Sequence, residues 1–330
     1  MLKINRRNFI HTITLAGATV ALPRFSFGHQ SAQKRVGIIG LDTSHSLAFT
    51  KLLNAENPDL SLDGYRVVAA YPYGSKDLAI SKERIPKQVI EIQQFGVKIS
   101  DSIAQLLSEV DVVLLETNDG RLHLSQALEV IKAGKPLFID KPLAASFKDG
   151  KAIFEAAKQH NVPVFSASSL RFMENVVAIR SGKYGKVLGA DTFSPAIIEP
   201  THPDLFWYGI HGIETLFAVM GTDCMSVSRV YTDETDIVVG KWKDGRIGTF
   251  RGTRTGKADF GGTCFTENGT FQLGPYLGYQ PLLVEIIKFF NTKIPPVSAA
   301  ETLAILAFME AAEESKGKGG ITVIPQRIDQ

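Results

Sequence analysis

The chain has 330 residues, of which 44% are hydrophobic and 21% are charged, and its formal net charge is +2. This length suffices for two domains of ordinary globular composition. No basic stripe with interleaved aromatic residues occurs, so the sequence argues against nucleic acid as a partner. Two cysteines, Cys224 and Cys264, are too few for a disulfide framework or a cysteine metal cluster, and we expect two buried thiols.

Residues 1–28 resemble a twin-arginine export signal. Arg6 and Arg7 precede a mildly apolar run, at about residues 12–22, that contains no acidic residue. This run is too short for a comfortable membrane span. We therefore expect a periplasmic protein that is cleaved after Gly28 and has no membrane span in its mature form. The alternative is a basic N-terminus without a targeting role.

From residue 34 onward the pattern alternates strands and helices. Runs of Val, Ile and Leu indicate strands buried on both faces, as in a parallel sheet covered by helices. Asp101 is the expected N-cap of one helix, and Gly134 ends another. The expected strands lie at 35–40, 65–71, 111–117, 135–140 and 162–168, and the expected helices at 45–54, 101–110, 123–134 and 147–161.

Residues 169–330 have a different pattern and are predicted to form a second, α+β domain. Strands dominate the stretch from 187 to 275, and "KDGR" and "ENGT" are typical hairpin turns. A helix at 209–221 interrupts them. A late helix begins after Ser298, the expected N-cap, with Glu301 at the capping-box position. The sheet of this domain is therefore expected to be largely antiparallel and open.

Six segments in the same order resemble motifs of the Gfo/Idh/MocA oxidoreductases. The most informative is "AGKPLFIDKPLAAS", in which Lys141 and Pro142 match the family's E-K-P element and Asp140 replaces its Glu. The resemblance spans residues 34–325. The other five segments are "VGIIG", "ETNDGRLH", "SLRFM", "GIHGIETL" and "PPVSAAETLAILAFMEAAEES".

The resemblance implies a Rossmann domain at 34–168, a substrate domain at 169–330 and a site between them. The family's usual chemistry is hydride transfer between a sugar or cyclitol hydroxyl and a nicotinamide. Removal of a hydride also requires a base for the hydroxyl proton. Lys141 is expected to stabilise the alkoxide and His211 to take the proton. The resemblance also suggests a cis bond between Lys141 and Pro142.

The dinucleotide fingerprint is incomplete. After Gly40, the glycines expected at positions 42 and 45 are Asp42 and His45. A helix N-terminus still offers N–H groups to a phosphate, so we expect NAD or NADP bound in an altered way. No acid follows the second strand, and Ser75 and Lys76 favour NADP weakly. The other residues expected to bind the cofactor are Thr43, Ser44, Thr117, Asn118, His123, Asp140, Lys141 and Arg171.

The substrate side also departs from the family. The Asp that usually lies four residues before the histidine is Trp207 here, so Tyr208 or Asp204 is the candidate partner of His211. Trp207 either stacks on a sugar or packs between domains. Lys141, Asp204, Trp207, Tyr208 and His211 form the expected substrate site.

Two other classes of function remain open. One is a lyase, epimerase or hydrolase with tightly bound NAD, and the other is a non-catalytic carbohydrate-binding or partner subunit with a decayed site. No ligand spacing is present among the seven histidines, so no metal site is predicted. A homo-oligomer formed through the C-terminal sheet is expected.

Overall fold

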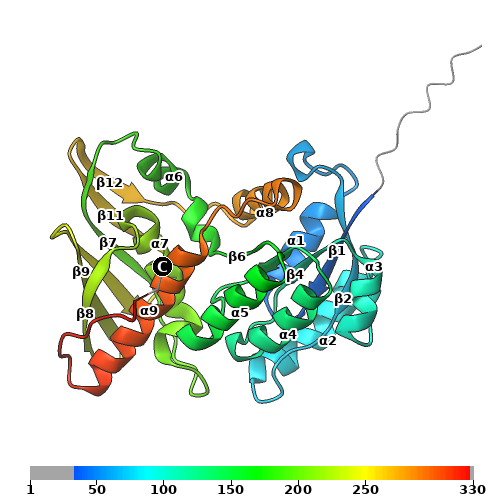
Figure 1. Ribbon diagram of the computed structural model, residues 1–330, viewed down its shortest axis with the longest axis horizontal. Coiled ribbons are helices and arrows are strands. Elements are labelled where there is room, and N and C mark those ends of the chain that lie inside the picture. The colour runs from blue at the N-terminus through cyan, green and yellow to red at the C-terminus, as the bar shows by residue number, and fades with distance from the viewer. Residues whose placement is uncertain (1–32, 328–330) are drawn as a thin grey trace, which may run out of the picture. The chain divides into compact units, whose positions relative to one another are not determined.

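The computed structural model describes residues 33–327. The expected signal at 1–28 lies outside these residues. Within the described part, two six-stranded sheets organise the chain (Figure 1). A parallel sheet precedes a largely antiparallel one, which confirms the predicted fold class. No helix in this part of the chain is long and apolar enough to cross a membrane.

The first sheet has the strand order β3-β2-β1-β4-β5-β6, and all its pairs are parallel. This order reverses between β1 and β4, and ligands of such sheets bind at that point, beyond the carboxyl ends of the strands. The strands are β1 (Lys34–Ile39), β2 (Tyr65–Tyr71), β3 (Lys98–Ile99), β4 (Val112–Leu115), β5 (Leu137–Ile139) and β6 (Val164–Ser166). The connecting helices are α1 (Ser44–Leu53), α2 (Ala79–Gln93), α3 (Ile103–Glu109), α4 (Gly120–Lys132) and α5 (Phe147–Gln159), with a short turn of 3₁₀ helix, η2 (Leu60–Leu62).

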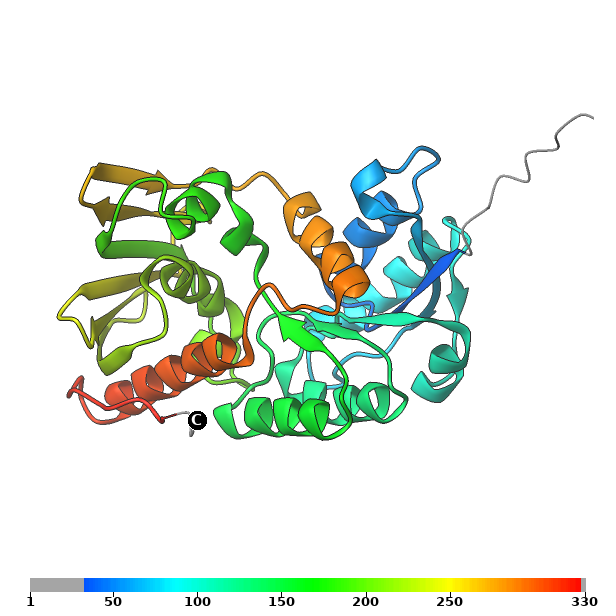
Figure 2. The ribbon, with the colours of Figure 1, turned by 45° about the horizontal axis from the view of Figure 1, so that its top comes forward.

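A late helix, α8 (Gln280–Thr292), packs on this first sheet. Leu283, Ile286 and Phe289 are buried in one cluster with Val36 and Phe138. Figures 1 and 2 show α8 beside α1 and β1, away from the second sheet. The prediction that residues 169–330 form a separate domain is therefore wrong for α8. Its apolar face is buried against strands that precede it by more than a hundred residues.

The second sheet has the order β12-β11-β7-β10-β9-β8. Only its β7–β10 pair is parallel. The "KDGR" and "ENGT" turns join β9 to β10 and β11 to β12, as predicted, with Gly245 and Gly269 at positive φ. The strands are β7 (Val187–Pro195), β8 (Cys224–Tyr231), β9 (Thr235–Trp242), β10 (Ile247–Thr253), β11 (Gly261–Thr266) and β12 (Gly269–Leu273).

Helices α7 and α9 pack on the second sheet (Figure 1). Ser298 caps α9 by accepting a hydrogen bond from the backbone N–H of Glu301, as predicted. The cap predicted at Asp101 is wrong, because Ser102 accepts from the N–H of Gln105 instead. The remaining elements are η3 (Ser169–Phe172), α6 (Glu174–Arg180), a π-helical turn η4 (Leu205–Gly209), α7 (Ile210–Met220) and α9 (Ala299–Gly317).

Candidate active site

A small polar cavity lies where the carboxyl edge of the first sheet meets α7 of the second domain. Its volume is about 100 Å³. The start of α1, the loops after β4 and β5, and the η4–α7 segment all contribute to its wall. The lining residues are Thr43, Ser44, His45, Ile80, Arg84, Asn118, Lys141, Ser169, Leu170, Tyr208, His211, Phe260, Tyr276 and Tyr279.

Lys141 and His211 line this cavity from opposite domains. Lys141 follows β5, and its peptide bond to Pro142 is cis. Its Nζ lies 3.6 Å from Oδ2 of Asp140. Burial disfavours the charged lysine, but Asp140 together with Tyr208, Tyr279 and Glu116 outweighs burial and raises the pKa of Lys141. The side chain therefore carries a positive charge into the cavity.

His211 is held neutral. Burial, together with the Lys141 ammonium, lowers its pKa well below 6.5. Its Nδ1 lies 2.8 Å from Oγ of Ser168, which leaves Nε2 as the ring nitrogen available to a bound molecule. The π-helical turn η4 immediately precedes α7, and such turns are frequent at functional sites. Tyr208, on that turn, contacts the His211 ring at a centroid distance of 5.5 Å.

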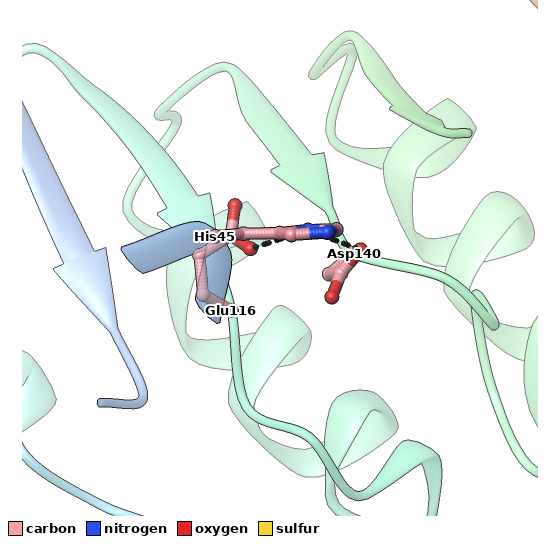
Figure 3. A group of neighbouring side chains, drawn as sticks. All are labelled: His45, Glu116 and Asp140. Carbon is pink, nitrogen blue, oxygen red and sulfur yellow. Dashed lines mark ion pairs between the residues drawn. The ribbon is translucent and has the colours of Figure 1, made fainter. Parts of the chain in front are cut away.

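Three buried ionisable side chains form a cluster beside the cavity (Figure 3). His45 Nδ1 lies 3.0 Å from Asp140 Oδ1 and 3.6 Å from Glu116 Oε2. Burial disfavours the His45 imidazolium, but the two carboxylates outweigh burial and raise the pKa of His45. Burial raises the pKa of Glu116, whereas the positive charges of His45 and Lys141 overcome burial and lower that of Asp140.

Comparison with known families identifies the N-terminal domain. The model of the GFO_IDH_MocA family, described as an oxidoreductase family with an NAD-binding Rossmann fold, matches residues 34–168. The N-terminal domain of this chain therefore matches that family.

Individual relatives agree with this match. Inositol 2-dehydrogenase of Serratia proteamaculans is 28% identical over 206 residues, which are 58% of this chain and 59% of that protein. 1,5-anhydro-D-fructose reductase of Ensifer adhaerens is 29% identical over 107 residues, 30% of this chain and 31% of that protein. The chain matches less than two thirds of the length of such curated relatives.

A solved structure shares the fold. Myo-inositol dehydrogenase from Lactobacillus casei, in complex with NAD(H) and myo-inositol, superposes with a TM-score of 0.71 at 18% identity. The match covers 90% of this chain and 98% of that chain. The two-domain architecture of this chain is therefore an architecture found in solved dehydrogenases.

The phosphate-binding part of the Gfo/Idh/MocA fold is altered in this chain. Gly40 keeps φ at +92°, and a Cβ there would lie 2.4 Å from the backbone N of Thr117. Asp42, at the second fingerprint position, is fully buried and accepts from the hydroxyl of Ser81 and the N–H of Asn118. Burial raises the pKa of Asp42 to about 6. An acidic side chain at this point is unfavourable for the binding of a pyrophosphate, because it adds bulk and negative charge.

Helix α2 and the segment before it cover the same loop. A Cβ on Gly74 would lie 2.5 Å from Oδ2 of Asp42. Arg84 donates to the carbonyl of Asp42 at 3.1 Å, and Gln88 donates to that of Thr43 at 2.7 Å. The cavity is also well below the roughly 300 Å³ of an ordinary ligand pocket. The residues present therefore do not fit a dinucleotide bound in the ordinary way.

Several predicted cofactor residues have structural roles instead. Arg171 is fully buried and pairs with Glu214 and Glu301, so it is not accessible to a cofactor. His123 is equally buried, and its ring nitrogens contact backbone carbonyls of Thr117, Pro142 and Leu143.

The residues that were expected to select NADP are also placed elsewhere. The Ser75 hydroxyl is buried and donates to the Asp119 carboxylate. Lys76 is exposed and does not line the cavity. Thr117 is buried beneath the loop, with its hydroxyl close to Gly40. Of the predicted cofactor residues, those that line the cavity are Thr43, Ser44, His45, Asn118 and Lys141.

Two substrate predictions are corrected. Trp207 does not line the cavity and packs on His202, with ring centroids 4.8 Å apart. Asp204 pairs with Arg229 and Lys316, so it is not the partner of His211. These contacts favour domain packing over sugar stacking for Trp207.

The sequence reasoning missed Glu116, Arg84, Phe260, Tyr276 and Tyr279. Glu116 had a usable signal, since an acid directly after an apolar strand lies at the ligand-binding edge of a parallel sheet. Tyr276 and Tyr279 had no such signal in the sequence, because they lie in the loop before α8. Tyr279 packs on His45 with centroids 4.4 Å apart, and its hydroxyl bonds Ser44.

Proposed function

We propose that this protein is an oxidoreductase that acts on a hydroxyl or ketone of a sugar, cyclitol or glycoside. The observation that carries the proposal is the meeting of Lys141 and His211 in one cavity. They come from different domains and are the two residues to which the family resemblance assigns the proton chemistry. The acid and base of an alcohol oxidation are thus provided by this chain.

The charges of the two side chains suit their roles. The Lys141 ammonium stabilises the negative charge that develops on the substrate oxygen. His211 is neutral at neutral pH, and in the tautomer whose Nδ1–H donates to Ser168, Nε2 accepts the hydroxyl proton. The Ser168 hydroxyl at Nδ1 fixes the plane of the ring. General-base catalysis of this kind contributes about 10²–10⁴ in rate.

NAD or NADP is the redox partner that the family and the relatives favour. The burial of Asp42 and the covering helix α2 count against the usual binding mode. We therefore propose that a nucleotide, when bound, is held differently from the ordinary fingerprint. The same observations favour a second candidate, a lyase or epimerase in which Lys141 and His211 move protons without an exchangeable dinucleotide.

Nucleotide binding by the purified protein separates the two candidates. The protein is purified without added nucleotide and denatured, and the supernatant is assayed for NAD(H) and NADP(H). Saturable binding of added NAD(P)H, measured by fluorescence, supports the oxidoreductase. Turnover of a sugar-like substrate without such exchangeable binding supports the second candidate, whether or not denaturation releases a tightly held nucleotide.

The substrate class is proposed from the relatives and from the cavity. The curated relatives include an inositol dehydrogenase and an anhydrofructose reductase. Tyr208, Tyr276 and Tyr279 give the cavity both aromatic faces and hydroxyl groups, a combination suited to polyols. Screening oxidised and reduced sugars and cyclitols tests this proposal, and turnover confined to substrates without hydroxyl groups would refute it.

We also propose a homo-oligomer formed through the outer face of the second sheet. Ile247 of β10 and Phe265 of β11 each pair with Gly189 of β7, so both belong to one row of side chains. They are 55% and 40% exposed, which is unusual for apolar side chains at the centre of a sheet. Light scattering of the Ile247→Lys variant should show dissociation, and an unchanged mass would contradict this interface.

A further inference from the structure

His45, Glu116 and Asp140 come from three separate segments that meet at the carboxyl edge of the first sheet. His45 lies in the first turn of α1, Glu116 directly follows β4, and Asp140 directly follows β5. Figure 3 shows the three side chains converging on one point from these elements. All three are at most 4% exposed.

The polar atoms of this cluster lack sufficient partners. Neither oxygen of Glu116 has a hydrogen-bond donor among residues 33–327, and the same holds for Oδ2 of Asp140. His45 Nδ1 is near both carboxylates but makes no hydrogen bond of acceptable geometry within that range. An uncompensated buried charge costs several kcal/mol, so such groups normally pair or coordinate a metal.

A protonated His45 compensates these charges only in part. The single N–H at Nδ1 can donate to one carboxylate, while the cluster presents two. Glu116 Oε2 is already 3.6 Å away, beyond hydrogen-bond distance. A proton on His45 therefore leaves Glu116 without a direct partner.

The spacing of the three groups suits a metal ion. Each of the three residues has one potential ligand atom that lies within 4.8 Å of a ligand atom of the other two. Nδ1 of His45 lies 3.0 Å from Oδ1 of Asp140 and 3.6 Å from Oε2 of Glu116. Ligands about 2.0–2.2 Å from one ion are separated by about 3.0–3.5 Å in octahedral or tetrahedral sets. The N–H of Lys141 donates to Oδ1 of Asp140 at 2.8 Å and orients that carboxylate, as outer partners of metal ligands do.

We propose that His45, Glu116 and Asp140 bind a divalent transition-metal ion. One imidazole and two carboxylates are a ligand set suited to Zn²⁺, Mn²⁺ or Fe²⁺. The absence of a metal-binding spacing in the sequence is no obstacle, because the three ligands come from distant segments. Two of them stand where the family resemblance leads one to expect a glycine and a glutamate, so both departures serve one site.

The ion would lie at the wall of the cavity that holds Lys141 and His211. His45 lines that cavity, so an ion bound to His45 would lie close to it. A metal there polarises a hydroxyl or carbonyl oxygen as a Lewis acid. Metal binding itself does not depend on the proposed redox reaction, and it can be tested without a substrate.

The test measures bound metal directly. The full chain is stripped with EDTA, equilibrated with Zn²⁺ or Mn²⁺, passed through a desalting column and analysed by mass spectrometry of the metal. The wild-type protein should retain about one ion per chain, and thermal unfolding should shift to higher temperature with added metal. Glu116→Gln, which keeps the size of the side chain, should lose both effects.

Asp42→Asn is the matched control, because Asp42 is a buried carboxylate of the same domain outside the cluster. This variant should retain the ion. His45→Gln provides a second ligand variant, and circular dichroism verifies that each variant is folded. Absence of bound metal in the wild-type protein, or equal retention in both ligand variants, would overturn the proposal.

Discussion

Ser168 Oγ lies 2.8 Å from Nδ1 of His211. A hydroxyl thus occupies the place where the family resemblance leads one to expect a carboxylate. Ser168 also accepts from the N–H of Leu170 at 3.3 Å, so the hydroxyl is itself held in position. An uncharged partner orients the imidazole without favouring its protonated form, which agrees with the lowered pKa of His211.

Ser168→Ala should therefore lower kcat by about fivefold, the equivalent of one hydrogen bond of about 1 kcal/mol. The KM should stay near its wild-type value, because Ser168 orients His211 and is not among the cavity-lining residues. Steady-state kinetics on the first substrate found by screening measures both constants. A raised KM with unchanged kcat would contradict an orienting role.

His211→Ala should lower turnover by about 10²–10⁴, because it removes the general base. The fold should persist, since the imidazole of His211 has only one hydrogen-bond partner, Ser168, among the residues that the structure describes. The exposed His160, at the C-terminal end of α5, provides the control variant His160→Ala. Equal turnover in the two variants would remove His211 from the mechanism.

Asp42 makes the stability of the protein depend on pH. Burial raises its pKa to about 6 from a usual 3.8, so the folded state holds a proton that the unfolded state has released. The contribution of Asp42 to stability is therefore fully present below about pH 4 and falls by about 3 kcal/mol as the pH rises to about 6. The polar groups that face Asp42 are Ser81, Asn118, Arg84 and the nearby Asp119.

Asp42→Asn removes this titration. Relative to the wild-type protein, the variant should gain about 3 kcal/mol of unfolding free energy between pH 4 and pH 7. Urea unfolding at each pH measures the difference in unfolding free energy between the two proteins. All other groups titrate in both proteins, so their contributions cancel in this difference. A difference that does not change with pH would show that the carboxyl of Asp42 titrates normally.

Gly212 allows α7 to approach the second sheet. A Cβ at this position would lie 2.5 Å from Phe250. Gly212→Ala should destabilise the protein by about 1–3 kcal/mol through overpacking and should displace the neighbouring His211. Gly317→Ala is the control, because no atom lies within 4 Å of the added methyl and alanine favours a helix. In urea unfolding, the free energy of unfolding of Gly317→Ala should equal or exceed that of the wild-type protein.

We propose export through the twin-arginine route from Arg6 and Arg7. Replacing both arginines with lysine should trap a folded precursor in the cytoplasm. Cell fractionation and immunoblotting of the precursor and mature forms measure this effect. Unchanged export of the variant, or export in a strain without the twin-arginine translocase, would refute the proposal.

Local patterns in the sequence predicted most of the fold. The apolar runs of β1 and β4 are buried because a parallel sheet is covered on both faces, and that burial is visible in composition alone. The Asp-Gly and Asn-Gly turns and the Ser298 cap depend on neighbouring residues only. Helix α2 was missed because Pro86 lies within it. Helix α8 was missed because its apolar face matches strands far away in the chain.

The candidate site, like the fold, has parts that the sequence predicts and parts that it does not. The sequence by itself identified Lys141 and His211, since each lies in a recognisable motif at a predictable position. Only the tertiary structure could bring His45, Glu116 and Asp140 together, or assign Ser168 rather than Asp204 to His211. Such pairings depend on which strand ends are adjacent and on how side chains fill the space between two domains. That information resides in packing between distant segments, so no local pattern carries it.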